Sequence, residues 1–193
     1  MPSRAEAVSL LEEWVENEGL RNHMRSVEIA VRAYARRFGQ DEEQWGLAGL
    51  LHDLDWEKYP DEHPLRAVKA LRAKGYDEAI LHAILAHRPD VTGVKPESQL
   101  DRTLSACDEI TGLITATALV RPTGIGGLTA KSVKKKMKDP AFARGVDRNE
   151  VRHAVEELGV DLDEHIQTVI DAMSTIADEL GLSRPAVTTQ EEA

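Results

Sequence analysis

The run Trp45-Gly-Leu-Ala-Gly-Leu-Leu-His-Asp53 is apolar along its whole length, except for the imidazole and the carboxylate with which it ends. Burying both groups at the end of an apolar helix costs free energy unless a partner satisfies them. A divalent metal ion is the simplest partner that several histidines and aspartates can share. The run therefore predicts a buried helix that carries part of a metal site.

Other histidines are placed where they could join His52 and Asp53. His23 lies at the start of its expected helix, in the segment Asn22-His23-Met-Arg-Ser-Val27. His63 precedes Pro64, and because proline favours the first turn of a helix, we expect His63 to sit at a helix start and turn inward.

His87 is near the end of an apolar helix, five residues after His82. The two side chains point about 140° apart around a helix, so we expect only one of them to face the site. We choose His87 because the end of the helix leaves room. The remaining histidines, His153 and His165, lie on helices that look exposed, and we expect neither to be a ligand.

Asp108 borders the apolar stripe of a long helix. An ionised carboxylate in that position needs a cation or several hydrogen bonds. Two plainer interpretations stay open: Asp108 could pair with Arg102 or a lysine, and Asp53 could cap the next segment. The stripe recurs at helical spacing and consists of Leu100, Leu104, Cys107, Thr111, Ile114 and Ala118.

The rest of the chain carries helical signals and no convincing alternation of period two. Capping pairs mark several helix starts: Ser3…Glu6, Asp41…Gln44, Asp147…Glu150 and Asp161…Glu164. The expected helices lie near 3–17, 21–38, 42–52, 64–74, 77–87, 98–120, 128–138, 148–158 and 162–180. We therefore expect a single all-α domain over 1–181, with the ligands in about 20–120, an extension over 121–181 on the same core, and a flexible tail over 182–193.

Composition limits the classes of protein to consider. The chain has 193 residues, of which 41% are hydrophobic and 30% charged, and its net charge is −10. No segment approaches the roughly 20 apolar residues of a membrane span, and the first residues contain no apolar signal core. The lone Cys107 suits a reducing compartment. We expect a cytoplasmic protein without membrane contact or broad nucleic-acid binding, and leave a homo-oligomer open.

Three segments together resemble the HD superfamily of metal-dependent phosphohydrolases over about 20–120. They are His23-Met-Arg-Ser-Val-Glu-Ile-Ala30, Ala48-Gly-Leu-Leu-His-Asp53 and His63-Pro-Leu-Arg-Ala67, and His87 matches a further histidine of the two-metal branch. The family is all-helical. The resemblance implies one metal held by His23, His52, Asp53 and Asp108. It implies that Asp53 bridges to a second metal, held also by His63 and His87.

The resemblance also implies a function. It predicts hydrolysis of a small phosphate ester, a nucleotide-type monoester or diester, by a metal-activated water, with His52 and Asp53 as catalytic residues. Imidazole and carboxylate ligands favour one or two ions of Fe, Mn, Co, Ni or Zn over Mg. Candidate substrate contacts are Arg25, Lys58, Arg88, Arg121, Lys131 and Lys134. Two alternatives stay open: a di-iron oxygenase of the same fold, and a non-enzymatic metal-binding regulatory module.

Two features depart from the family pattern or lie beyond it. Leu54-Asp55-Trp56 follows the His-Asp pair where the family often has Ile-Gly-Lys, so the usual phosphate-contacting lysine is absent, and Lys58 could replace it. Further on, a glycine-rich loop over 121–127 leads into a lysine-rich helix over 128–138. That helix is either a solvated amphipathic face or a phosphate clamp at the mouth of the site.

Overall fold

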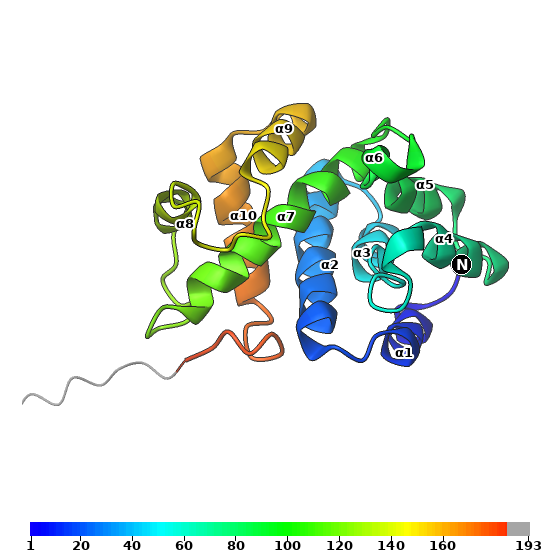
Figure 1. Cartoon of the computed structure of the whole chain (residues 1–193), viewed down its shortest axis with the longest axis horizontal. Coiled ribbons are helices and arrows are strands. Elements are labelled where there is room, and N and C mark those ends of the chain that lie inside the picture. The colour runs from blue at the N-terminus through cyan, green and yellow to red at the C-terminus, as the bar shows by residue number, and fades with distance from the viewer. Residues whose placement is uncertain (185–193) are drawn as a thin grey trace, which may run out of the picture.

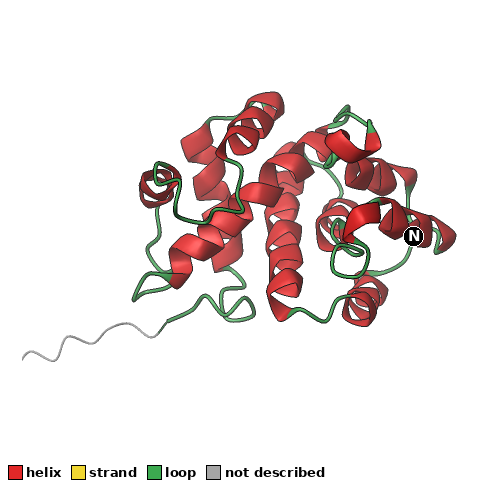
Figure 2. Cartoon of the chain, viewed as in Figure 1, coloured by secondary structure: helices red, strands yellow, loops and turns green. Residues whose placement is uncertain are grey.

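The computed structural model describes residues 1–184, and its regular elements there are helices, with no strand (Figure 2). This confirms the predicted all-α class. The α-helices are α1 (Arg4–Trp14), α2 (Glu18–Phe38), α3 (Glu42–Leu51), α4 (Leu65–Ala73), α5 (Glu78–Ala86), α6 (Pro89–Thr92), α7 (Gln99–Leu119), α8 (Ala130–Met137), α9 (Arg148–Leu158) and α10 (Leu162–Ser174). A short 3-10 helix, η1 (Pro60–Glu62), precedes α4.

The predicted helices agree with these bounds to within a few residues, with two differences. The short elements η1 and α6 were not expected. The last helix ends at Ser174, not near residue 180. The hydroxyls of Ser174 and Thr175 bond to the carbonyls of Ile170 and Ala172, and such local bonds compete with continuation of a helix.

Helices α2 and α3 approach each other closely because α3 presents glycines to α2. A Cβ on Gly49 would lie 2.8 Å from the Cα of Glu28, and one on Gly46 would lie 2.5 Å from the Arg32 side chain. The Gly-Leu-Ala-Gly spacing of the apolar run therefore fixes the separation of the two helices. As a result, His23 on α2 and His52 at the end of α3 lie near each other.

Helix α7 crosses the middle of the molecule, beside α2 (Figure 1). Ser98 begins it with a capping box, and the predicted apolar stripe is buried along its length. Helices α5, α9 and α10 also pack against it. Because α7 contacts both the N-terminal and the C-terminal helices, it joins them into one continuous apolar core.

The extension after α7 packs on that same core through the buried side chains Ile166, Val169, Ile170 and Met173. The expected tail begins too early at residue 182, because Leu182 is buried and its carbonyl accepts a hydrogen bond from the Ile125 N–H. The remainder of the expected tail, 185–193, lies outside the described residues. Within 1–184, no helix combines the length and the hydropathy that crossing a bilayer requires.

Candidate metal centre

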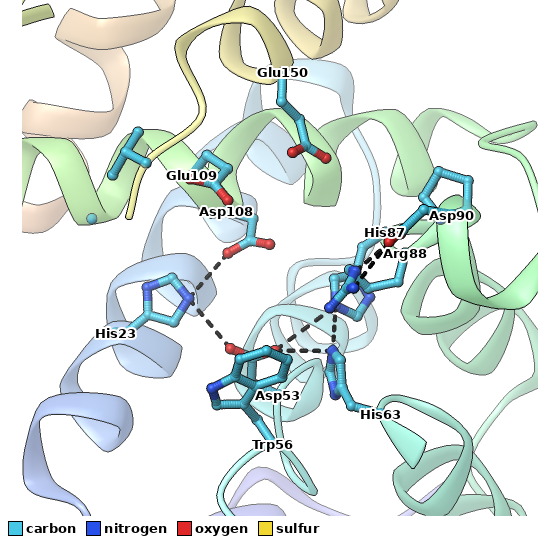
Figure 3. A pocket seen from close by; sticks show the side chains of 13 residues that line it. His23, Asp53, Trp56, His63, His87, Arg88, Asp90, Asp108, Glu109 and Glu150 are labelled. Atoms are coloured by element: carbon cyan, nitrogen blue, oxygen red, sulfur yellow. Dashed lines mark hydrogen bonds and ion pairs between the residues drawn. The ribbon is translucent and has the colours of Figure 1, made fainter. Parts of the chain in front are cut away.

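The structure brings the predicted ligands into two adjoining groups of three. One contains His23, His52 and Asp108, and we call it the helix triad; the other contains Asp53, His63 and His87, and we call it the loop triad. Within each triad, one donor atom per residue lies within 4.8 Å of the others. The side chains converge from α2, α7, the end of α3, the loop before α4 and the end of α5, and Figure 3 draws all of them except His52.

Asp53 stands between the two triads. Its Oδ2 lies 3.7 Å from His23 Nε2 and 3.5 Å from His52 Nε2. Its Oδ1 lies 3.4 Å from His63 Nε2 and 3.8 Å from His87 Nε2. Each oxygen of the carboxylate therefore faces a different pair of histidines, which is the arrangement of a carboxylate that bridges two ions.

In the helix triad, Asp108 Oδ1 lies 3.0 Å from His23 Nε2 and 3.4 Å from His52 Nε2. The other ring nitrogens point away from the centre. His52 Nδ1 donates to the Gly49 carbonyl at 2.9 Å, and His23 Nδ1 donates to the Thr111 hydroxyl oxygen at 3.3 Å. Both rings therefore present Nε2 to the site.

In the loop triad, other partners hold the Nδ1 atoms of the two histidines, so that both rings again present Nε2 to the site. His87 Nδ1 donates to the Ile84 carbonyl, and His63 Nδ1 donates to a carboxylate oxygen of Asp55 at 2.7 Å. Asp55 is fully buried, and its second oxygen accepts from the Ala67 N–H at 2.7 Å. A histidine held in this way at Nδ1 has its Nε2 lone pair free and correctly aimed for a metal ion.

Two features of the nitrogen atoms indicate that this donor set fits a cation. His63 Nε2 and His87 Nε2 face each other at 3.1 Å, and with both Nδ1 atoms protonated their lone pairs repel unless a positive charge lies between them. His52 Nε2 is buried and, among the described residues, has no hydrogen-bond partner. Such an atom carries a full desolvation cost until something binds it. Imidazole nitrogens and carboxylates suit transition-metal ions.

The charges in the cluster support ionised carboxylates. Burial opposes charge on Asp108, but His52 and His23 outweigh it and hold the pKa of Asp108 well below its usual range. Burial lowers the pKa of His52, but the carboxylates of Asp53 and Asp108 raise it to about 9, so a metal ion that binds His52 Nε2 would displace a proton. The carboxylates are therefore negative at neutral pH and attract a cation strongly.

A cavity of about 510 Å³ opens over both triads. Besides the ligands, it is lined by Trp56, Arg88, Pro89, Asp90, Glu109, Gly112, Val146 and Glu150. Burial, helped by the nearby Asp108 and Glu150, raises the pKa of Glu109 to about 7. Apart from the ligands, carboxylates outnumber basic side chains on these walls.

Of the predicted substrate contacts, the structure brings only Arg88 to this cavity. Its guanidinium pairs with Asp90 at 3.0 Å and lies 5.8 Å over the Trp56 ring. Arg25 instead reaches Glu12 and Glu18 on another face. Lys58, proposed as a replacement for the family lysine, donates to the Glu13 carbonyl, away from the cavity.

The phosphate clamp expected from the lysine-rich segment is not at the site either. Helix α8, which carries Lys131 and Lys134, lies on the opposite side of the molecule from α3 and α4 (Figure 1). Lys134 pairs with Asp163 at 2.5 Å. In the preceding loop, Arg121 donates to the carbonyls of Gly124 and Gly126, so it ties its own loop together.

Three of the first four N–H groups of α8, those of Ala130, Ser132 and Val133, are also satisfied within the fold. Ala130 N donates to Gln167 Oε1 at 3.1 Å, and Ser132 N bonds to the Thr129 hydroxyl. A helix start whose donors are already used does not offer an anion site of the expected kind. The solvated-face interpretation of the lysine-rich helix therefore agrees better with the structure.

The histidines that were not chosen as ligands lie outside the two triads. His82 pairs with Asp101, and His153 is exposed on α9. His165 was expected on an exposed face, and this is wrong: it is fully buried between Tyr34 and the Ala106 carbonyl. Its helix has an apolar face that packs on α2 and α7, which the sequence pattern alone did not orient.

Sequence reasoning missed four residues of the site: Asp55, Trp56, Glu109 and Glu150. Asp55 could have been noticed as a carboxylate two residues after the His-Asp pair, where the family pattern has glycine. Trp56 occupies the position of the missing lysine, and its ring packs edge-on against His63 at 5.1 Å between centroids. Glu109 follows the predicted ligand Asp108 on α7, and that neighbourhood was its signal. Glu150 reaches the cavity only through the packing of α9 on α7, for which the sequence gives no local signal.

Comparison with known proteins agrees with this geometry. The family profile described as HD domain matches residues 20–113, which include every member of the two triads. Residues 20–113, just under half of the chain, thus match the HD domain and support a place in the HD superfamily.

At the level of single proteins, the chain is 34% identical over 99 residues to Ribonuclease Y of Oleidesulfovibrio alaskensis. That match covers 50% of this chain and 18% of the relative, so the chain spans less than a fifth of the curated protein it matches. No solved structure matches the chain.

Proposed function

We propose that this protein binds two divalent transition-metal ions and hydrolyses a small phosphate ester of nucleotide type. The observation that carries the proposal is Asp53, whose two carboxylate oxygens face two separate pairs of histidine Nε2 atoms. The cavity of about 510 Å³ above them is large enough for a small ester. Hydrolysis adds water across the P–O bond and releases an alcohol and a phosphate.

The protein side chains would hold and orient. His23, His52 and Asp108 would hold one ion, His63 and His87 the other, and Asp53 both. Ions held there would lower the pKa of a water molecule and polarise a phosphoryl oxygen. The bonds from each Nδ1 to a fixed acceptor keep the rings from turning, so the centre is arranged before substrate arrives.

Arg88 is the basic side chain best placed to contact the phosphate, since it lines the cavity beside both triads. Its pairing with Asp90 leaves the guanidinium fixed in direction. Trp56 is 42% exposed at the cavity wall and offers a flat apolar surface where the family pattern places a lysine. Recognition of the phosphate would therefore rest mainly on the metal centre and Arg88.

The test is phosphate release by purified protein loaded in turn with Mn²⁺, Fe²⁺, Co²⁺, Ni²⁺ or Zn²⁺. Substrates would be nucleoside monophosphates, p-nitrophenyl phosphate and bis-p-nitrophenyl phosphate, assayed with and without oxygen. We expect metal-dependent release that does not need oxygen. Consumption of oxygen in step with product would instead indicate the di-iron oxygenase alternative.

Matched variants separate the site from the fold. His87→Gln should abolish release, whereas His82→Gln, which alters a histidine on the same helix outside the triads, should retain it. If every metal-loaded sample is inactive on all substrates, or if His87→Gln equals the wild type, the proposal fails. Circular dichroism of each variant would confirm that both remain folded.

A further inference from the structure

A second chamber adjoins the metal cavity on the side of α9. It has a volume of about 350 Å³ and shares its wall with the first cavity through His87, Pro89, Asp108, Glu109 and Glu150. Volumes of about 300–1,000 Å³ are typical of small-molecule sites. A group joined to a phosphate at the metal centre could therefore extend into this chamber.

Part of the chamber's lining lies outside the segment that matches the HD profile. Helix α9 supplies Glu150, His153 and Glu157 to its lining, and α9 begins at Arg148, beyond the residues 20–113 that match the HD profile. The opposite wall comes from α5 and α7, which carry metal-centre residues. What enters the chamber is thus determined partly by the C-terminal extension.

The lining has both apolar and polar parts. Ala86, Pro96 and Ala154 provide apolar surface. Ser105 also lines the chamber, and its Oγ is buried without a hydrogen-bond partner among the described residues. A hydrogen bond from a ligand or a water would remove the free-energy cost of leaving this buried hydroxyl unpaired. Such a lining suits an uncharged group that carries a few hydrogen-bonding atoms, such as a nucleoside.

The charges on the walls disfavour an anion. Lys95 is the one lysine or arginine among the described residues of this chamber, and Glu150 and Glu157 oppose it. Glu109, whose pKa burial raises to about 7, carries only part of a negative charge at neutral pH. Neither Glu109 nor Glu150 forms an ion pair with any basic side chain in 1–184. Arg88 lines the neighbouring metal cavity and not this chamber, so it serves the phosphate at the metal centre.

The metal centre itself leaves little positive charge to spare. Two divalent ions carry twice the charge of the two carboxylates that would hold them, and the surplus equals the charge of one phosphate dianion. A second anionic group on the same substrate would meet Glu150 and Glu157, against which Lys95 is the one lysine or arginine among the described residues of the chamber. Like charges at short range in a partly buried site repel strongly.

We propose that this chamber binds the leaving group of a phosphate monoester and selects uncharged leaving groups over those that bear a second phosphate. This inference rests on the proposed function and narrows its substrate class. Water cleaves the P–O bond, inorganic phosphate leaves from the metal centre, and the alcohol, with the proton it gains, leaves from the chamber.

The test compares adenosine 5′-monophosphate with adenosine 3′,5′-bisphosphate, with p-nitrophenyl phosphate as a reporter of the metal centre. Whichever phosphate of the bisphosphate occupies the metal centre, the other lies on the leaving group. We expect kcat/KM for the bisphosphate to be at least about tenfold lower than for the monophosphate. In the doubly substituted variant Glu150→Gln with Glu157→Gln, this ratio should shrink to about threefold or less, through faster hydrolysis of the bisphosphate.

Glu156→Gln is the matched control, because Glu156 is exposed on α9 and lines neither cavity. It should leave the ratio as in the wild type. Equal hydrolysis of both nucleotides, or a ratio that the double substitution leaves unaltered, would overturn the chamber assignment and leave the proposed function standing. So would turnover of p-nitrophenyl phosphate without turnover of the monophosphate. Inactivity on all three substrates would overturn the proposed function and this inference together.

Discussion

The two triads of the metal centre are built by different means. The helix triad takes its ligands from α2, the end of α3 and α7, which belong to the apolar core. The loop triad takes His63 from the segment between η1 and α4, and a buried carboxylate, Asp55, holds that ring. The helix triad is therefore positioned mainly by helix packing, and the loop triad mainly by hydrogen bonds.

Asp53 is the residue that the two triads share, so its substitution should have the largest effect. Asp53→Asn removes the negative charge that faces both pairs of histidines. We expect a fall in kcat/KM of about 1,000-fold or more, because several kcal/mol of charge stabilisation are lost. Steady-state phosphate release would measure it, with the exposed Asp61→Asn as control. A fall of less than tenfold would show that Asp53 does not join the triads.

Asp55 tests the loop triad by itself. Asp55→Asn weakens the 2.7 Å contact that holds His63, and we expect the loop triad to bind its metal about 10- to 100-fold more weakly. Thr111→Val alters the corresponding, longer contact of His23 at 3.3 Å, and should cost the helix triad less than about tenfold. Metal titration followed by calorimetry would compare the two variants. Equal losses would remove the contrast between the triads.

Gly49 tests the helix triad through packing. Gly49→Ala places a Cβ 2.8 Å from the Glu28 Cα, so α2 and α3 must move apart. We expect a loss of about 1–3 kcal/mol in the free energy of unfolding, as overpacking usually costs. Gly145→Ala has open space around its Cβ and serves as control. Denaturant unfolding would compare the two variants, and Gly49→Ala should unfold at the lower denaturant concentration. Equal midpoints would show that the approach of the helices is not tight.

His165 joins α10 to α2 and α7, which carry residues of the helix triad, through its bonds to Tyr34 and to the Ala106 carbonyl. Burial lowers the pKa of His165 from an ordinary value of 6.5 to about 4. The unfolded chain therefore gains a proton below pH 6.5 that the folded chain takes up only near pH 4. The free energy of unfolding should fall as the pH drops through this window, by about 1 kcal/mol per pH unit from this group. His165→Gln should flatten that slope in denaturant unfolding at several pH values. Identical slopes would contradict the buried neutral state.

Much of the fold and of the ligand set was predictable because the signals are local. Helix periodicity and caps such as Ser3 place the ends of helices within a few residues, and the ordered motifs pick out the six residues that meet in the triads. The angle between His82 and His87 on one helix predicted that only one of them faces the site, and His87 was chosen because the end of the helix leaves room; the structure places only His87 at the centre.

What could not be predicted depends on how distant elements pack. Glu150 lines the site because α9 rests on α7, and no local pattern encodes that contact. The lysines of α8 looked like a clamp because their charge is evident, but their distance from the site is set by packing on α10. Asp55 was hidden because a carboxylate after a helix resembles any surface residue until its burial is known.

The number of metal ions bound per chain tests the two-triad arrangement most directly. Elemental analysis of Co²⁺- or Mn²⁺-loaded protein after dialysis should give two ions per chain in the wild type. His23→Gln and His63→Gln, each taking one histidine from a different triad, should each give one ion while remaining folded. A wild-type value of one or none, or a value of two that neither substitution lowers, would contradict it.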